Sequence, residues 1–208
     1  MENAERILDF LKFSEKLKTQ KRDNLLSDGK KESVADHSWH LALMALVVHP
    51  HLEESVDLLK VFKMILIHDL PEAELGDIPF SKSVENPELK KEKDEQEKLE
   101  IEKIKNKIGG DIGKEINELW QEYKERKTKE AKFVKALDSL EADYQGILFD
   151  NISYWDDIYY SLVFIKSDKH CVHEKILQEI NSEIKKRTEE KMLDIGIDVN
   201  KIKEKLNI

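Results

Sequence analysis

The sequence predicts an all-α protein, and three of its properties favour this fold class. Its 208 residues include only 7 glycines and 4 prolines, the residues that most often interrupt helices. Charged residues make up 38% of the chain, and Glu, Lys and Leu are abundant, as is typical of long helices. Apolar residues also recur at intervals of three and four in most segments, which places them on one face of a helix. A chain of this length can form one substantial domain, or a domain with a small appendage.

The first expected helix covers residues 4–17, where apolar positions repeat at helical spacing. Residues 18–31 are mostly polar and contain Gly29 near their end, so we expect a loop there. Arg22 lies in this loop, and its spacing alone indicates only a solvated charge.

A second helix is expected over residues 33–51, with His37 near its start. His37 and Leu41 are four residues apart, so they share the apolar face of this helix. A histidine on an apolar face is usually a core residue or a cap, unless a second polar group converges on it. The other histidines of this segment are expected at the surface: His40, His49 and His51.

Residues 57–69 form a third expected helix that is apolar on all sides, which predicts burial in the middle of the domain. Pro71 cannot continue a helix, so this one should end near Asp69, and Pro71 is suited to open the next. The helix thus ends in the pair His68-Asp69, and both side chains are good ligands for a divalent metal. Alone the pair is weak evidence, because a core histidine is the more common explanation. Further acidic residues follow at Glu72, Glu74 and Asp77.

Charge dominates residues 87–107, which we expect to form an exposed, protruding helix with little chemistry. Two amphipathic helices should follow, over residues 111–124 and 130–149. Asp138 lies on the apolar side of the second, and a buried carboxylate needs a partner. An ion pair with a nearby lysine such as Lys135 is the simplest explanation.

The C-terminal segments indicate packing more than chemistry. Residues 151–160 are aromatic and acidic. Residues 170–173 read His-Cys-Val-His but lack a second pair at zinc-finger spacing, so we expect them to be structural or solvated. A long charged helix over residues 175–191 and a polar tail over residues 194–208 complete the chain.

Taken in order, these candidates form the pattern His…His-Asp…Asp. With the residues around them, they make the chain resemble the HD-domain metal-dependent phosphohydrolases, and more closely the 5′-deoxynucleotidase-like branch of that superfamily. The resemblance spans about residues 4–165. Four passages carry it: Leu17-Lys18 with Arg22, Glu32 to Trp39, Ile67 to Glu72 with Gly76-Asp77, and Phe133 to Asp138.

The resemblance implies an HD-domain helical bundle in which His37, His68, Asp69 and Asp138 hold one divalent metal ion. Two imidazoles with two carboxylates suit manganese, cobalt, zinc or iron, so the metal stays unidentified. Relatives of this branch are commonly dimers, and we expect a homodimer.

The same resemblance assigns the remaining site residues. Arg22 would bind the substrate phosphate, and Glu72 and Asp77 would be catalytic, as groups that transfer protons or position water. Some relatives carry a tryptophan just after the arginine, whereas residues 23–25 here read Asp-Asn-Leu. This departure leaves the preference for deoxyribose and for a base open. Trp39 is a nearby aromatic residue, but we expect it to pack.

The implied activity is hydrolysis of (deoxy)nucleoside 5′-monophosphates to nucleoside and phosphate. Two alternatives stay open: an HD hydrolase of another small phosphate or pyrophosphate ester, and a non-catalytic metal-binding helical module. The lack of a dense basic cluster near the site disfavours a triphosphate substrate. The presence of Glu72 and Asp77 beside a full ligand set disfavours the non-catalytic module.

Charge and composition limit the partners. The 35 basic and 44 acidic residues give a net charge of −9, which argues against a surface for duplex nucleic acid. The single cysteine, Cys171, rules out an intramolecular disulfide framework and suits a reducing compartment. No apolar run approaches the ~20 residues that span a membrane, and the N-terminus lacks the apolar core of a signal peptide. We expect a cytoplasmic protein with a small-molecule nucleotide substrate and no membrane contact.

These expectations combine into a single HD domain over residues 1–208. Its core should cover about residues 4–165, with a charged helical insertion at about 85–108 and a C-terminal helical extension at about 170–208.

Overall fold

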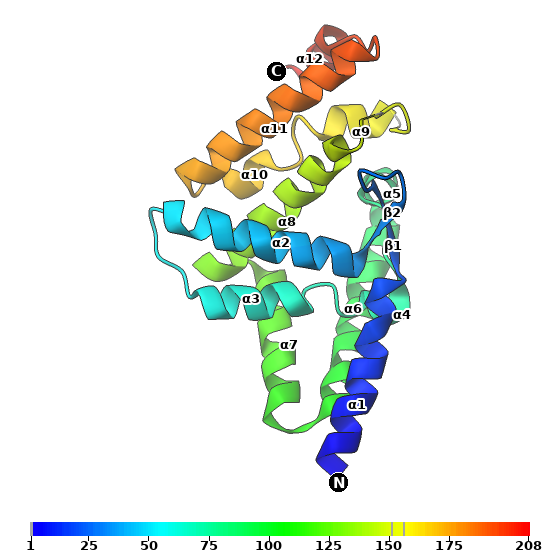
Figure 1. The fold of residues 1–208 in the computed structure, drawn as a ribbon, viewed down its shortest axis with the longest axis vertical. Coiled ribbons are helices and arrows are strands. Elements are labelled where there is room, and N and C mark those ends of the chain that lie inside the picture. Colours follow the sequence, from blue (N-terminus) through cyan, green and yellow to red (C-terminus); the bar gives the residue numbers. More distant parts are fainter. Residues whose placement is uncertain (1, 151, 156) are drawn as a thin grey trace.

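The computed structural model describes residues 2–150, 152–155 and 157–208, and it confirms the all-α prediction. Helices follow one another along the chain, with one short hairpin near the N-terminus (Figure 1). The elements are α1 (Glu2–Ser14), η1 (Glu15–Lys18), β1 (Lys21–Leu25), β2 (Lys31–Ser33), α2 (Val34–Val48), η2 (His49–His51), α3 (Leu58–Ile67), α4 (Glu72–Leu75), α5 (Phe80–Glu85), α6 (Pro87–Ile108), α7 (Gly110–Glu125), α8 (Lys129–Leu148), α9 (Asp157–Leu162), α10 (Asp168–Cys171), α11 (Lys175–Asp194) and α12 (Val199–Leu206).

The loop predicted over residues 18–31 is wrong, because most of it forms an antiparallel hairpin of β1 and β2. The turn is closed by a hydrogen bond from the Leu26 N–H to the Lys30 carbonyl oxygen, 2.8 Å. Gly29 adopts a φ of +81°, a left-handed conformation that other residues rarely adopt. The strands are short and polar, so they carry no alternating apolar pattern by which the sequence could reveal them. The hairpin matters because it places Arg22 on a strand.

A capping box fixes the start of α2. The Ser33 hydroxyl oxygen accepts a hydrogen bond from the Asp36 N–H at 3.1 Å, and the Asp36 carboxylate accepts one from the Ser33 N–H at 2.9 Å. The helix therefore begins at Val34, and His37 lies in its first turn on the same buried face as Leu41, as predicted.

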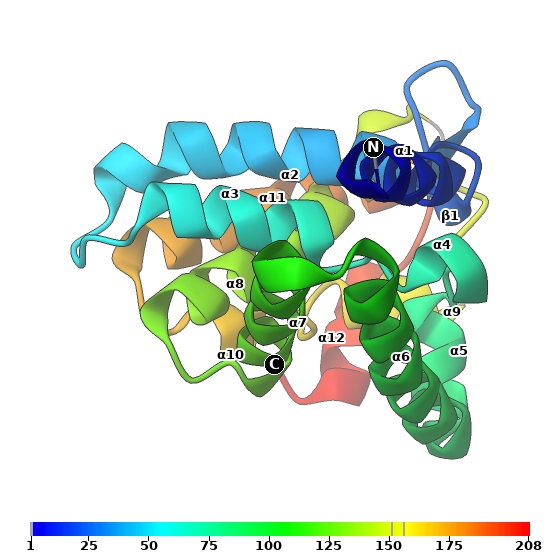
Figure 2. The same ribbon diagram turned by 90° about the horizontal axis from the view of Figure 1, so that it is seen from below.

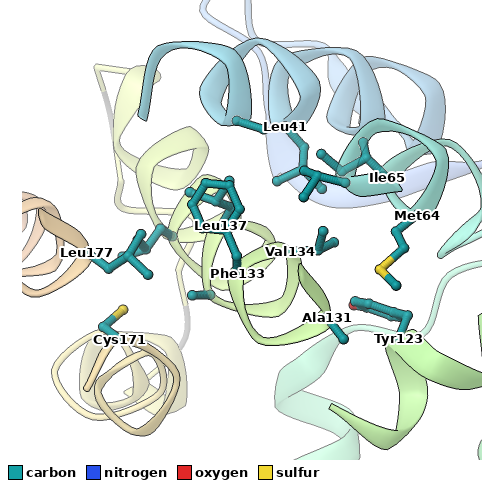
Figure 3. Packing of buried hydrophobic residues seen from close by; sticks show 14 of the residues in the cluster. Leu41, Met64, Ile65, Tyr123, Ala131, Phe133, Val134, Leu137, Cys171 and Leu177 are labelled. Atoms are coloured by element: carbon teal, nitrogen blue, oxygen red, sulfur yellow. The ribbon is translucent and has the colours of Figure 1, made fainter. Parts of the chain in front are cut away.

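The core is centred on α8, which packs against α2, α3, α7 and α11. Figure 3 shows Phe133, Val134 and Leu137 of α8 among the apolar side chains of neighbouring helices. Burial of such side chains is the main favourable contribution to folding. Because α8 is buried on nearly every side, a polar residue on it is held in a fixed environment.

The prediction that α3 is buried all round is wrong. One face packs Val61, Met64 and Ile65 into the core, but Leu59 and Leu66 are 65% and 67% exposed. Helices α2 and α3 lie side by side at the edge of the fold (Figure 2), so the outer face of α3 has no covering element in the described chain.

The charged helix α6 is only partly as expected. It is long and largely exposed, yet it buries Ile101 and Ile104, packs against α7 and α1, and also contacts α4. None of the described helices combines the length and the apolar character that crossing a membrane requires.

Candidate metal centre

Four predicted side chains converge between three helices. His37 comes from the first turn of α2, His68 and Asp69 follow the last turn of α3, and Asp138 lies in the middle of α8. The His68 Nε2 atom is 3.1 Å from Asp69 Oδ2, and the His37 Nε2 atom is 3.3 Å from Asp138 Oδ1 and 4.0 Å from Asp69 Oδ2. Donor atoms of His37, His68 and Asp69 lie within 4.8 Å of one another, which is close enough to share one ion.

The chain between α3 and α4 positions this group. As predicted, α3 ends just before Asp69, and Pro71 stands at the start of α4. Gly76 then ends α4 with a φ of +75°, which turns the chain so that Asp77 lines the same cavity as Glu72.

Hydrogen bonds fix how the two imidazoles are oriented. The His37 Nδ1 atom bonds to the Glu141 carboxylate, and the His68 Nδ1–H donates to the Ile65 carbonyl oxygen at 2.8 Å. Each ring therefore points its Nε2 atom at the two aspartates. Both Nε2 atoms are buried and have no hydrogen-bond partner among the described residues. Two such nitrogens beside two carboxylates fit a divalent metal ion, which would satisfy all four groups.

The charges around these residues favour a cation at this point. Burial raises the pKa of Asp69, but His68 and Arg22 outweigh it and hold this pKa well below its usual range. Burial likewise opposes ionisation of Asp138, but Lys135 and the two histidines keep its pKa low. Burial and Arg22 lower the pKa of His37, yet Glu141 and Asp138 raise it to about 10. The site attracts either a proton or a metal ion.

The predicted ion pair of Lys135 with Asp138 also exists and does not compete with this arrangement. Lys135 Nζ is 2.7 Å from Asp138 Oδ2, and the Tyr123 hydroxyl donates to the same oxygen at 2.9 Å. The other oxygen, Oδ1, faces His37. These two contacts orient the carboxylate on α8.

The remaining predicted site residues line a cavity of about 250 Å³ beside the four side chains. Arg22 is 14% exposed; its Nε–H donates to Glu32 at 3.2 Å and its Nη1–H to Asp69 at 3.5 Å. Glu72 is buried, and Asp77 is 13% exposed. All seven predicted residues therefore occupy one region of the molecule.

Several contributors to this region were not expected from the sequence. Glu141 is fully buried and accepts hydrogen bonds from His37 and His40. Its place three residues after Asp138, on the same face of α8, was the available signal. Lys93 of α6 lines the cavity and bonds to Glu72, so the charged segment 87–107 contributes to the walls of this region.

Two further expectations are corrected near α2. His40 was expected at the surface, but it is half-buried, and its Nδ1 atom bonds to Glu141 at 2.9 Å. Trp39 does not pack into the core: it is 68% exposed and stacks on His40. Of the residues 170–173, Cys171 is buried, whereas His170 lines the cavity with a pKa lowered to about 4 by burial and by nearby cations such as Lys135.

Glu141→Gln should weaken metal binding by about 10- to 100-fold, the usual cost of disturbing a group that orients a metal-binding histidine. The reason is that the Glu141 carboxylate is negatively charged and accepts a hydrogen bond on each of its oxygens, from His37 and from His40, whereas an amide is uncharged and has only one oxygen. Metal titration of the apoprotein measures this effect. Glu130→Gln is the matched control, since Glu130 is a buried carboxylate on the same helix that bonds to the Asp57 N–H. Equal metal affinity in wild type and Glu141→Gln would contradict the role of Glu141.

Comparison with known proteins gives consistent similarities. A family model described as "HD domain" matches residues 14–181. A protein named 5′-deoxynucleotidase HDDC2 from Dictyostelium discoideum is 38% identical over 151 residues, which cover 69% of this chain and 77% of the relative. The human protein of the same name is 30% identical over 153 residues, covering 73% of this chain and 72% of the relative.

Solved structures agree with this result. A crystal structure described as a predicted metal-dependent phosphohydrolase from Magnetospirillum magnetotacticum MS-1 superposes with a TM-score of 0.73 at 25% sequence identity. The similarity covers 92% of this chain and 96% of the other. The stretch matched by the family model includes the hairpin and helices α2, α3 and α8, which together supply Arg22 and the four converging side chains.

Proposed function

This chain belongs to the HD-domain family, and on that premise we propose that it is a metal-dependent phosphomonoesterase. Its proposed reaction is hydrolysis of (deoxy)nucleoside 5′-monophosphates to nucleoside and phosphate. The observation that carries the proposal is the pair of buried Nε2 atoms of His37 and His68, which have no hydrogen-bond partner in the described part of the chain and face Asp69 and Asp138 beside the cavity. The names of the relatives support the substrate class.

In this proposal His37, His68, Asp69 and Asp138 hold one divalent ion, which the donor set allows to be manganese, cobalt, zinc or iron. When bound, such an ion supplies Lewis acidity toward a phosphoryl oxygen and toward water. The protein side chains then have to bind the phosphate, orient it and move protons. Hydrolysis of a phosphate monoester is extremely slow in water, so all of these contributions are needed.

Arg22 is the proposed phosphate-binding residue. Two of its N–H groups bond to Glu32 and Asp69, which fixes the guanidinium plane at the cavity. No other hydrogen bond of Arg22 occurs in the described part of the chain, so further N–H groups are available to phosphate oxygens. The planar fork of a guanidinium suits this task.

Glu72 is the proposed proton-transfer group. Burial raises the pKa of Glu72 well above its ordinary value, and the neighbouring charges of Asp69 and Asp77 raise it further, against the effect of Lys93. A carboxyl group whose pKa is raised holds its proton more readily, which favours a role in proton transfer. Asp77, on the same side of the cavity, is the proposed assistant at the leaving nucleoside oxygen.

Arg22→Ala should lower kcat/KM by about 10- to 100-fold, since hydrogen bonds to a charged group contribute about 1.5–3 kcal/mol. The bound metal should stay in place. Lys21→Ala is the matched control, because Lys21 is its exposed neighbour on β1 and, among the described residues, its side chain bonds only to the Lys31 carbonyl oxygen. Steady-state kinetics on matched deoxyribo- and ribonucleotides measures the loss and also the sugar preference. Arg22→Ala kinetics equal to those of Lys21→Ala would refute the phosphate-binding role.

A phosphate-release screen over nucleoside 5′-monophosphates, with each of several divalent metals, tests the proposed function. We expect turnover of at least one mononucleotide class that depends on added metal. Turnover of only other phosphate or pyrophosphate esters would favour the alternative hydrolase. Stoichiometric metal without any phosphate release would favour the non-catalytic metal-binding module.

We also infer a homodimer from the exposed apolar side chains on the outer faces of α2 and α3. On each helix these exposed apolar side chains form one stripe, and burying both stripes against a second copy of the chain would remove them from water. Sedimentation velocity tests this inference, and a concentration-independent monomer would contradict it. The stripe residues are Trp39, Leu43, Leu46, Val47, Leu59 and Leu66. The cytoplasmic location, and the division of residues 1–208 into core, insertion and extension, stay predictions.

A further inference from the structure

Lys93 of the charged helix α6 reaches into the cavity and faces three carboxylates. Its ammonium nitrogen lies 2.8 Å from Glu72 Oε1, 3.7 Å from Glu97 Oε1 and 3.9 Å from Asp77 Oδ1. The side chain is only 16% exposed, although most of α6 faces solvent. The stem of Lys93 therefore delivers a positive charge to the two residues assigned to proton transfer.

The position of this lysine is fixed by a second layer of contacts. Glu97 is buried; it accepts a hydrogen bond from Lys124 of α7 at 2.5 Å and forms an ion pair with Lys93 at 3.7 Å. Lys124 also pairs with Asp94 at 3.0 Å and lies over the Trp120 ring. An isolated surface ion pair contributes little to stability, but Lys93 is shielded from solvent and contacts carboxylates on several sides. Its arrangement indicates a positioned group.

Charge explains why a cation is needed there. Glu72 and Asp77 line the same cavity as Asp69, so three carboxylates lie close together in a site that is largely shielded from solvent. Like charges at such distances disfavour ionisation of the whole group. Lys93 contacts both Glu72 and Asp77, and Arg22 pairs with Asp69 and Glu32.

The hydrogen bond also differentiates the two oxygens of Glu72. Oε1 bonds to Lys93, whereas Oε2 is buried and has no partner among the described residues. The bond to Oε1 thereby orients the carboxyl group of Glu72. A carboxyl that could rotate freely would lose much of the advantage of being positioned.

We infer that Lys93 is a positioning residue for catalysis, which holds Glu72 and Asp77 beside each other at the cavity. This role rests on the proposed function. Helix α6 would then contribute to catalysis through Lys93 as well as pack against α7. A purely structural ion pair would contribute to stability without affecting the chemical step.

The test compares Lys93→Met, Lys93→Arg and Lys91→Met in the metal-loaded full chain with a nucleoside 5′-monophosphate. Lys93→Met should lower kcat by up to about 10²-fold with little change in KM or in metal content. Lys93→Arg should recover part of the loss, because it keeps the charge and a hydrogen bond to Glu72. Lys91→Met is the control: Lys91 is exposed on the same helix, does not line the cavity, and has no ion pair in the described chain.

A double-mutant cycle separates positioning from general destabilisation. If Lys93 acts through Glu72, adding Lys93→Met to Glu72→Gln should cost much less than it costs the wild type. Melting temperatures identify a folding defect, and Lys93→Gln replaces Lys93→Met in the cycle if the latter does not fold.

Unchanged kcat in a folded Lys93→Met, or a full additional loss in the Glu72→Gln background, would overturn the inference and leave the phosphomonoesterase assignment intact. A metal-loaded wild type without turnover would overturn the proposed function, and this role with it.

Discussion

Replacing Asp69 by alanine should remove the bound metal and abolish phosphate release together. Asp69 Oδ2 lies between the Nε2 atoms of His68 and His37, at 3.1 and 4.0 Å, so its loss leaves the two imidazoles without a negative charge between them. His68→Ala should have the same effect, because it removes a buried nitrogen that no protein group in the described chain satisfies.

Metal analysis of the purified variants, alongside phosphate release, measures both effects. Glu74→Ala is the matched control, since Glu74 is an acidic residue of the same segment that is half-exposed and pairs with Lys16 away from the cavity. The control should keep metal and activity. Full metal occupancy in Asp69→Ala would contradict its assignment as a ligand.

Glu72→Gln should keep the metal and the substrate affinity but lower turnover by about 10²- to 10⁴-fold, the usual contribution of a general acid or base. Glutamine preserves the shape of the side chain and removes only its ability to transfer a proton. Asp77→Asn should also lower turnover, and the double variant should lose less than the product of the two single losses.

Single-turnover kinetics on metal-loaded protein isolates the chemical step for this comparison. Wild-type turnover by Glu72→Gln at unchanged metal content would show that Glu72 is an ordinary carboxylate at the start of α4. It would also remove the basis for the positioning role of Lys93.

The sequence contains enough local information to place the four converging residues. His68 and Asp69 follow an apolar helix that Pro71 ends, and Asp138 interrupts an apolar helical face, so their surroundings are set by neighbours in the chain. The order of these residues together with His37 then made the resemblance to a family specific. Their convergence in space depends on how the helices pack, and the apolar pattern of each single helix carries no information about that packing.

Other features depend on contacts between distant segments and were missed for that reason. Glu141 bonds to His37 across 104 positions of the chain, and its spacing from Asp138 indicates only a shared face of α8 and does not identify His37 as its partner. Lys93 lies in a run of alternating charges in which no single lysine is distinguished by spacing. The hairpin that carries Arg22 is too short and polar to show a strand pattern. The exposed faces of α2 and α3, including Trp39, could not be told from buried ones by hydrophobicity alone.

Metal dependence of phosphate release is tested most directly by removing metal from the wild-type protein with a chelator and returning one divalent metal in steps. Metal content and phosphate release from a nucleoside 5′-monophosphate are measured at each step. We expect no turnover in the stripped protein and a rise in turnover that follows metal bound at His37, His68, Asp69 and Asp138. Full turnover by the metal-free protein would contradict it.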